Sequence, residues 1–279
     1  MIQFDRLGYF LPQGYLFSNV NLQINKGDKV GLVGKNGAGK STLLRILAGS
    51  TKPSDGQVHH PKSLKFGFLT QDIHIDSDKS VYDFLFYSNA TLNEIRERLD
   101  EINNELTIRT DYEAESYLGL LDELSELNHR FQVLEGYQWE EKIKATLEGL
   151  GFSLIDQQKM IAQCSGGWKM RAELARILVN TPDILLLDEP TNNLDPASRE
   201  EVLGALGTYK GAVILVTHDE GAVQALAPPQ RVEALVAEFD QTIAVLRNGD
   251  PTRPLFVPWD DDVRREFAAV EALWASERD

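Results

Sequence analysis

Three short apolar runs stand out along the chain, and each run ends in polar residues. They read DKVGLVG, DILLLDEP and GAVILVTHD, and the first is followed by the helical pattern STLLRILAG, which Gly49 closes. Apolar runs of this length are typical of strands buried in a parallel sheet. We therefore expect an α/β fold in which polar side chains gather at the carboxyl ends of the strands, where such folds bind ligands.

The stretch between Gln71 and Ser165 has a helical pattern instead. Two apolar stripes recur at spacings of three and four, separated by the polar segment TIRTDYEAES. Thr91 and Glu94 form a capping box at the start of the first stripe. We expect an antiparallel helical hairpin whose first helix is about 24 Å long. The first stripe comprises Leu92, Ile95, Leu99, Ile102 and Leu106, and the second Tyr117, Leu121, Leu124, Asn128, Phe131 and Leu134.

The last part of the chain changes in character. VEALVAEFDQTIAVLRNGD can form closing strands, and residues 251–279 form a tail. One face of a short amphipathic helix in this tail is apolar, and Asp260–Asp262 lie at its N-terminus. Whether that helix packs on this chain or on a partner stays open. The apolar face comprises Val263, Phe267, Val270 and Trp274.

Composition narrows the class of protein. The chain has 279 residues and a net charge of −15, which argues against non-specific adhesion to nucleic acid or anionic lipid. Its one cysteine, Cys164, excludes an internal disulfide and fits a reducing compartment. The N-terminus is too charged for a signal peptide, and no apolar run approaches the roughly 18 residues of a membrane span. We expect a cytoplasmic protein or a subunit docked on another protein.

A phosphate-binding loop follows the first strand. Residues 34–41, GKNGAGKS, match G-x-x-x-x-G-K-[ST] between a predicted strand and a predicted helix. Backbone N–H groups of such a loop cradle nucleotide phosphates, Lys40 would reach the terminal phosphates, and Ser41 would coordinate Mg²⁺. The predicted nucleotide-binding residues of the loop are Gly34, Lys35, Asn36, Gly37, Ala38, Gly39, Lys40, Ser41 and Thr42.

The other strand ends supply candidate catalytic groups. Asp188 is placed to hold Mg²⁺, and Glu189 would polarise the attacking water because successive strand side chains point in opposite directions. His218 closes the third apolar run, where it would contact the γ-phosphate and position the water. Gln71 closes SLKFGFLTQD and would bind either Mg²⁺ or the water.

A second anion-binding turn is predicted at CSGGWKM. Two glycines allow backbone N–H groups to approach a phosphate, and WKMRAELARILV reads as a helix whose N-terminus faces it. Trp168 follows the glycines and has no phosphate chemistry of its own.

Together these motifs resemble an ATP-binding-cassette ATPase over roughly residues 1–220: GKNGAGKST, Gln71, SGGWKMRAELARIL, ILLLDEPTNNLD and THD occur in the family's order. The resemblance implies a P-loop NTPase cassette with a mixed sheet, a helical signature subdomain and hydrolysis of ATP to ADP and phosphate. It also implies a head-to-tail pair, formed with a second copy or another cassette protein. ATP would then lie between the P-loop of one cassette and Ser165, Gly166 and Gly167 of the other, with Asp195 in a loop crossing the same interface.

Trp168 extends the resemblance to one branch of the family. SGGW followed by KMR, with the flanks of the P-loop, is similar to the first cassette of the F subfamily, whose members act largely on the ribosome as translation or antibiotic-resistance factors. They carry a hairpin "arm" where this chain has its helical insert. The resemblance implies a cassette over residues 1–250, with the arm at about 80–138, whereas the tail at 251–279 has no counterpart in it.

The chain departs from that subfamily because it holds one cassette and no long charged linker. This favours a second interpretation, the ATPase subunit of a membrane transporter. Whether the sequence is a fragment, a fusion or a single-cassette protein stays open. The acidic arm, with Arg109 near its tip, favours contact with protein, or with RNA at the tip alone.

The adenine base should stack on an aromatic residue near the N-terminus. GYFLPQGYLF offers Tyr9, Phe10 and Tyr15, and the spacing to the LFSNV strand favours Phe10. The alternative is that all three serve only in packing.

Overall fold

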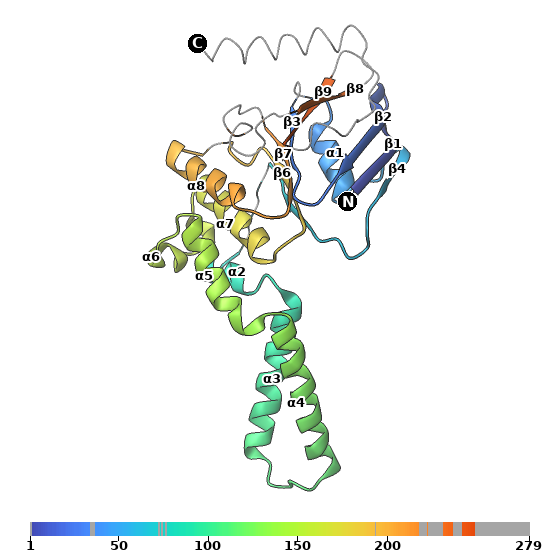
Figure 1. Ribbon diagram of the computed structural model, residues 1–279. Helices are drawn as coiled ribbons and strands as arrows, with labels where there is room; N and C mark the ends of the chain where they lie inside the picture. Colours follow the sequence, from blue (N-terminus) through green and yellow to red (C-terminus); the bar gives the residue numbers. More distant parts are fainter. Residues whose placement is uncertain are drawn as a thin grey trace. The chain divides into compact units, whose positions relative to one another are not determined.

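The structure, a computed structural model, describes residues 2–33, 37–71, 73, 75, 77–192, 194–217 and 222, and the backbone of two further strands at 231–236 and 242–248. It divides into two compact units (Figure 1). One unit comprises Met1–Asp72 and Pro182–Asp279, and the other comprises Ile73–Thr181.

The first unit contains a small antiparallel sheet with the strand order β2-β1-β4. Its register pairs Ile2 with Ile24 and Phe4 with Leu22, so that these apolar side chains share one buried face. The strands are β1 (Ile2–Leu11), β2 (Gly14–Ile24) and β4 (Asp55–His59).

A six-stranded sheet with the order β5-β6-β7-β3-β9-β8 forms the centre of this unit. The first four strands pair in parallel, whereas β9 and β8 pair antiparallel, so the predicted mixed sheet of a P-loop fold is confirmed. Every residue of β6 and β7 is buried, which explains their uninterrupted apolar runs. The strands are β3 (Lys29–Val33), β5 (Phe66–Leu69), β6 (Ile184–Asp188), β7 (Ala212–Val216), β8 (Arg231–Val236) and β9 (Thr242–Asn248).

Among the described residues of this unit, the helices α1 (Lys40–Leu47) and α8 (Pro196–Gly207) accompany the sheet. Helix α1 buries Leu43, Leu44, Ile46 and Leu47 in the same apolar cluster as β3 and β6. This packing fixes the start of α1 beside the carboxyl ends of the parallel strands.

The second unit is helical. Helices α2, α5 and α7 pack against one another, and the indole N–H of Trp139 donates to the Phe86 carbonyl at 3.0 Å. The helices are α2 (Val81–Phe86), α5 (Trp139–Gly149), α6 (Leu154–Gln157) and α7 (Gly166–Val179), with short 3₁₀ turns η1 (Gly136–Gln138) and η2 (Ile161–Gln163).

The predicted hairpin is confirmed as α3 (Ala90–Ile108) and α4 (Glu115–Val133), which lie side by side (Figure 1). With 19 residues, α3 is about 28 Å long. Leu92, Ile95, Leu99 and Ile102 are buried along the seam as expected, and Arg98 binds Glu123 across it at 2.7 Å.

Two details of the hairpin were predicted wrongly. Helix α3 begins at Ala90, and its cap is Asn89, whose side-chain oxygen accepts the Leu92 N–H at 3.1 Å, so Thr91 does not cap it. Asparagine is a favoured cap and lies two residues earlier. In the second stripe, Leu121 and Leu134 are 40% and 41% exposed, whereas the predicted Leu124 and the neighbouring Leu120 are half-buried.

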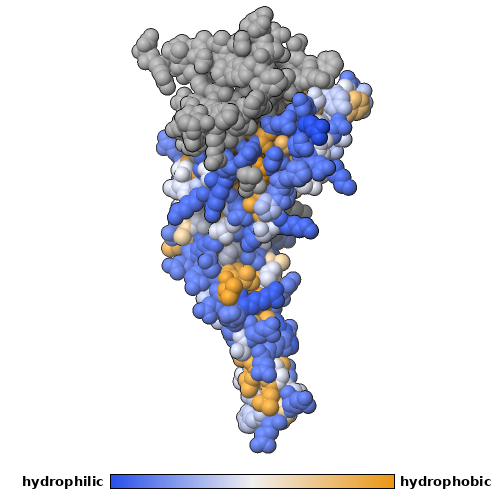
Figure 2. All heavy atoms as spheres, turned by 45° about the vertical axis from the view of Figure 1, so that its right-hand side comes forward, coloured by the Kyte–Doolittle hydropathy of each residue, from blue (hydrophilic) through white to orange (hydrophobic). Residues whose placement is uncertain are grey.

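The tip of the arm combines charged side chains with three exposed large hydrophobic residues, Ile108, Tyr112 and Leu118. Arg109 is held by Glu105, Asp111 and Ser116, so the one cation of the tip segment 105–118 is already bound within the arm. The face shown in Figure 2 is mostly hydrophilic along the arm, at the bottom of the view, with small hydrophobic patches. Within the tip segment 105–118, Arg109 is therefore not free to bind an RNA phosphate.

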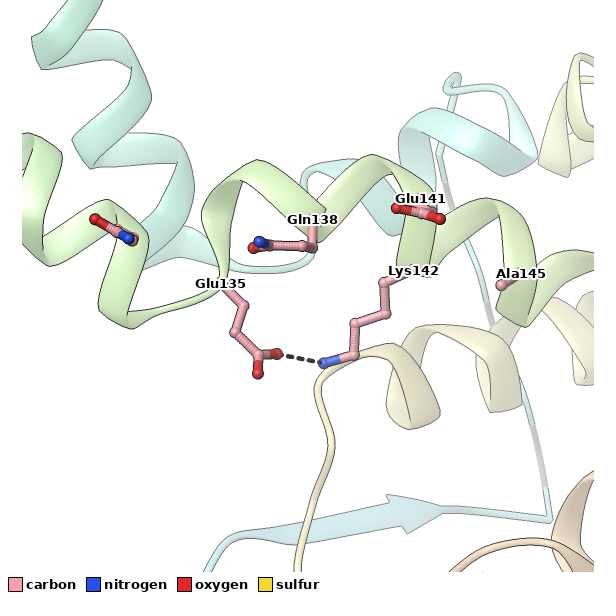
Figure 3. A pocket seen from close by; sticks show the side chains of 6 residues that line it. Glu135, Gln138, Glu141, Lys142 and Ala145 are labelled. Carbon is pink, nitrogen blue, oxygen red and sulfur yellow. Dashed lines mark ion pairs between the residues drawn. The ribbon is translucent and has the colours of Figure 1, made fainter.

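A groove of about 550 Å³ lies at the root of the arm (Figure 3). Its single cation, Lys142, binds Glu135 at 3.6 Å, and Glu141 adds a further negative charge. Because its charge is negative, this groove does not suit a nucleotide.

The predicted tail, including Val263, Phe267, Val270 and Trp274, lies outside the described residues.

Candidate nucleotide-binding site

The glycine loop leads from β3 into α1 as the sequence predicted. Gly39 has φ +96°, and a Cβ there would lie 2.9 Å from Leu16 and Phe17, so both the backbone and the packing require glycine. Gly37 also has a positive φ. The loop thus brings backbone groups to the N-terminus of α1, where the helix dipole favours anions.

Lys40 begins α1 with a buried side chain. Burial lowers the pKa of Lys40, and the nearby carboxylates of Glu189 and Asp188 act in the opposite direction. A lysine surrounded in this way is prepared to bind a phosphate.

Ser41 and Asp188 meet although 147 residues separate them. The Ser41 hydroxyl donates to Oδ1 of Asp188 at 3.0 Å. Asp188 is the last residue of β6 and is buried. A hydroxyl and a carboxylate oxygen at this place, with phosphate oxygens, form a donor set that fits Mg²⁺.

Glu189 lies in a strained turn directly after β6. Its φ is +54°, which is uncommon outside glycine. Its backbone N–H donates to the Val216 carbonyl at 2.9 Å and its carbonyl accepts the Asn192 N–H, so the turn is fixed at both sides. The carboxylate is buried, and Glu189 lines the same cavity as Lys40 and Ser41.

The P-loop, Lys40, Ser41 and Glu189 line one cavity of about 430 Å³, and Asp188 is not among its lining residues. The predicted residues that it brings together are Gly37, Gly39, Lys40, Ser41, Thr42, Gln71 and Glu189. Sequence reasoning missed Leu11, Leu16, Asn192 and Val216, which also line it. Asn192 could have been found from its place after the strand-end carboxylates, whereas the leucines resemble ordinary core residues.

Other predicted residues lie elsewhere or outside the described part. Phe10 is 53% exposed and packs edge-on against Tyr15 at 5.3 Å, and it does not line the cavity. Asp195 caps α8 by accepting the Ser198 N–H at 3.0 Å. Ala38 is buried in the core, so only its backbone can face a ligand. Gly34, Lys35, Asn36 and His218 lie outside the described residues.

The signature turn belongs to the helical unit. Ser165 is the N-cap of α7 and Gly166 is its first residue, so the helix begins two residues before the predicted start at Trp168. Ser165 and Gly166 are exposed, and the first turn of α7 contains no acidic residue. An exposed helix N-terminus without a neighbouring carboxylate favours an anionic ligand.

A glycine loop at a helix N-terminus, a buried lysine, and a serine hydroxyl bound to a strand-end aspartate define a P-loop nucleotide-binding protein. The family profile described as "ABC transporter" matches residues 17–192, more than half of the chain, and the chain belongs to this family, whose general activity is ATP hydrolysis. A second profile, "Type IV pili methyl-accepting chemotaxis transducer N-term", matches residues 207–279, which lie mostly outside the described residues.

Curated relatives confirm the resemblance to the F subfamily. ABC transporter F family member 5 of Arabidopsis thaliana is 35% identical over 212 residues, covering 76% of this chain and 30% of the relative. The tylosin resistance ATP-binding protein TlrC of Streptomyces fradiae is 33% identical, covering 84% and 41%. The energy-dependent translational throttle protein EttA of Escherichia coli K12 is 33% identical, covering 75% and 36%. The chain therefore spans about a third of the length of these relatives.

Solved structures agree on the fold. The dimeric ATP-binding cassette MJ0796, in a post-hydrolysis state bound to ADP and Pi, matches with a TM-score of 0.54 at 21% identity. The match covers 81% of this chain and 92% of that one. None of the helices among the described residues is long and apolar enough to cross a membrane.

Proposed function

We propose that this cassette binds ATP with Mg²⁺ and hydrolyses it within a head-to-tail pair of cassettes, and that the pair acts on the ribosome. The contact between Ser41 and Asp188 carries the first step, because it joins the P-loop to the strand-end carboxylate that a nucleotide-bound metal requires. Ser41, Asp188 and Gln71 would hold Mg²⁺, which when bound neutralises charge on the phosphates.

The residues of the chain divide the remaining work. Lys40 and the N–H groups of the loop bind the phosphates, and Glu189 accepts a proton from the attacking water. His218 and Gln71 orient that water and the γ-phosphate. The buried position of Glu189 supports its role, because removal from bulk water strengthens its interaction with the reacting water.

Pairing would bring two phosphate-binding turns together, the P-loop of one cassette and the signature turn of the other. Ser165, Gly166 and Gly167 would bind the γ-phosphate of ATP held by the partner's P-loop, with Asp195 at the same interface. The dimer of the cassette MJ0796 with ADP and Pi supports this arrangement. The partner would be a second copy or another cassette protein.

The ribosome is proposed as the target because of the names of two relatives. One is a translational throttle protein and the other confers tylosin resistance. The chain would then be a cytoplasmic translation or resistance factor, and its arm would contact protein. The alternative, a transporter subunit, predicts a membrane-embedded partner.

Sedimentation of the Glu189→Gln variant with ribosomal particles tests this function. Glu189→Gln should trap the ATP-bound pair, so we expect it to cosediment with ribosomes in MgATP but not without nucleotide. Lys40→Ala is the matched control and should stay in the supernatant. Absence of nucleotide-dependent cosedimentation, or copurification with a multispanning membrane protein, would contradict the proposal.

A further inference from the structure

The first turn of α7 lacks the usual stabilising groups of a helix start. Ser165 is the N-cap, yet its side chain makes no capping hydrogen bond, and no acidic residue follows in the first turn. Gly166 and Gly167 occupy the first two helical positions, and glycine is a poor helix former. Such a start frays unless another contact holds it.

Trp168 makes that contact from the third helical position. Its ring centroid lies 3.9 Å from the guanidinium carbon of Arg171, and the ring of Phe152 meets it edge-on with centroids 4.8 Å apart. Both partners are buried, and Arg171 also donates to the Leu150 carbonyl at 3.1 Å. The indole is therefore attached to a fixed part of the helical unit.

The direction of the side chain links this stack to the signature turn. Because a helical side chain points back toward the N-terminus, we expect the Trp168 indole to lie over the turn that begins at Ser165. The Lys169 N–H donates to the Ser165 carbonyl at 2.9 Å, which is the hydrogen bond that closes this turn.

We propose that Trp168 is a positioning residue that replaces the helix cap of α7. Its stack on Arg171 and Phe152 holds the first turn closed, so that the Ser165 hydroxyl and the N–H groups of Gly166 and Gly167 stay available for phosphate. In a capping serine, the hydroxyl is instead engaged in a hydrogen bond with an N–H group of the helix. The inference rests on the proposed function, since these groups act on ATP held by a partner.

The division of the site allows a test with an internal control. A Lys40→Ala chain can offer only its signature turn, and a Ser165→Arg chain can offer only its P-loop, so an equimolar mixture should regain ATPase activity through one composite site. Trp168→Ala on the Lys40→Ala chain should lower the recovered rate at subsaturating concentration by about 5- to 30-fold, the range expected for loss of a desolvated Trp–guanidinium stack. The same substitution on the Ser165→Arg chain should change nothing.

Several outcomes decide the proposal. Trp168→Phe on the Lys40→Ala chain keeps an aromatic face and should restore most of the rate. An equal loss of rate with Trp168→Ala on either chain would show general misfolding. No loss with Trp168→Ala on the Lys40→Ala chain would remove the positioning role. Either result overturns the proposal.

A measurement on the single chain keeps the two proposals separate. If the mixture of Lys40→Ala and Ser165→Arg chains shows no ATPase activity, two copies of this chain do not form the shared site. Hydrogen exchange then tests Trp168 alone: the Lys169 amide should exchange about 5- to 30-fold faster in Trp168→Ala than in the wild type. Unchanged exchange would overturn the role of Trp168.

Discussion

Lys40, Asp188 and Glu189 bring opposite charges together within the interior of the cassette. Buried charges are tolerated when they are paired, and here the lysine and two carboxylates interact with one another. Phosphate and Mg²⁺ can enter such a site because each finds an opposite charge already in place. These three side chains therefore define the chemistry of the site.

Glu189→Gln should abolish turnover while ATP still binds. Glutamine has the size of glutamate but cannot accept the proton, and a general base commonly contributes about 10²–10⁴-fold. Steady-state ATPase activity and nucleotide titration measure the two effects. Turnover at the wild-type rate would show that another group is the base.

Ser41→Ala should weaken the Mg²⁺-dependent part of ATP binding. The substitution removes the hydroxyl that contacts Asp188, a hydrogen bond to a charged group, which supports an effect of about tenfold. Titrating ATP at several Mg²⁺ concentrations measures it, and binding in EDTA is the control. An equal loss with and without Mg²⁺ would mean that Ser41 acts only in folding.

Phe10→Ala should reduce ATP affinity, because the exposed Phe10 ring is the surface proposed to stack on adenine. Aromatic stacking on a base contributes about 1–3 kcal/mol. Tyr15 is already hydrogen-bonded to Asp55 and Tyr9 packs on Phe17, so Tyr15→Ala and Tyr9→Ala serve as comparisons. Unchanged affinity in all three variants would remove aromatic stacking from this region.

At the scale of elements, the strands of the large sheet were predictable because their burial leaves uninterrupted apolar runs. The hairpin seam was predictable on the α3 side, where the spacing of apolar residues is regular. Leu121 was misplaced because adjacent leucines, Leu120 and Leu121, fit either face, and only contact with α3 chooses between them. Leu11 and Leu16 were missed since tertiary packing alone brings them beside the P-loop.

Gly136→Ala should destabilise the root of the arm by about 1–3 kcal/mol, the usual result of overpacking. A Cβ at Gly136 would lie 2.5 Å from the Phe131 ring. Gly119 lies inside α4 with open space around its Cβ position, so Gly119→Ala should instead stabilise the arm by about 0.5–1 kcal/mol. Urea unfolding of both variants compares them, and equal effects would contradict the packing described at Gly136.

At the scale of the whole molecule, the proposed pairing has to overcome the repulsion between two acidic chains. The chain carries a net charge of −15, so two copies repel each other. A ligand can overcome this only through its higher affinity for the paired state, which the proposed composite site would provide. The pair should therefore be weak without nucleotide and should tighten in salt, which screens the repulsion.

Light scattering of Glu189→Gln with and without MgATP tests the central claim, ATP-driven pairing through the signature turn, most directly. The account predicts a monomer mass without nucleotide and a doubled mass in MgATP. It also predicts a monomer mass for the Glu189→Gln, Ser165→Arg double variant in MgATP, because that chain binds ATP but offers no intact signature. A monomer mass for Glu189→Gln at high concentration in MgATP, or equal doubling in the double variant, would contradict it.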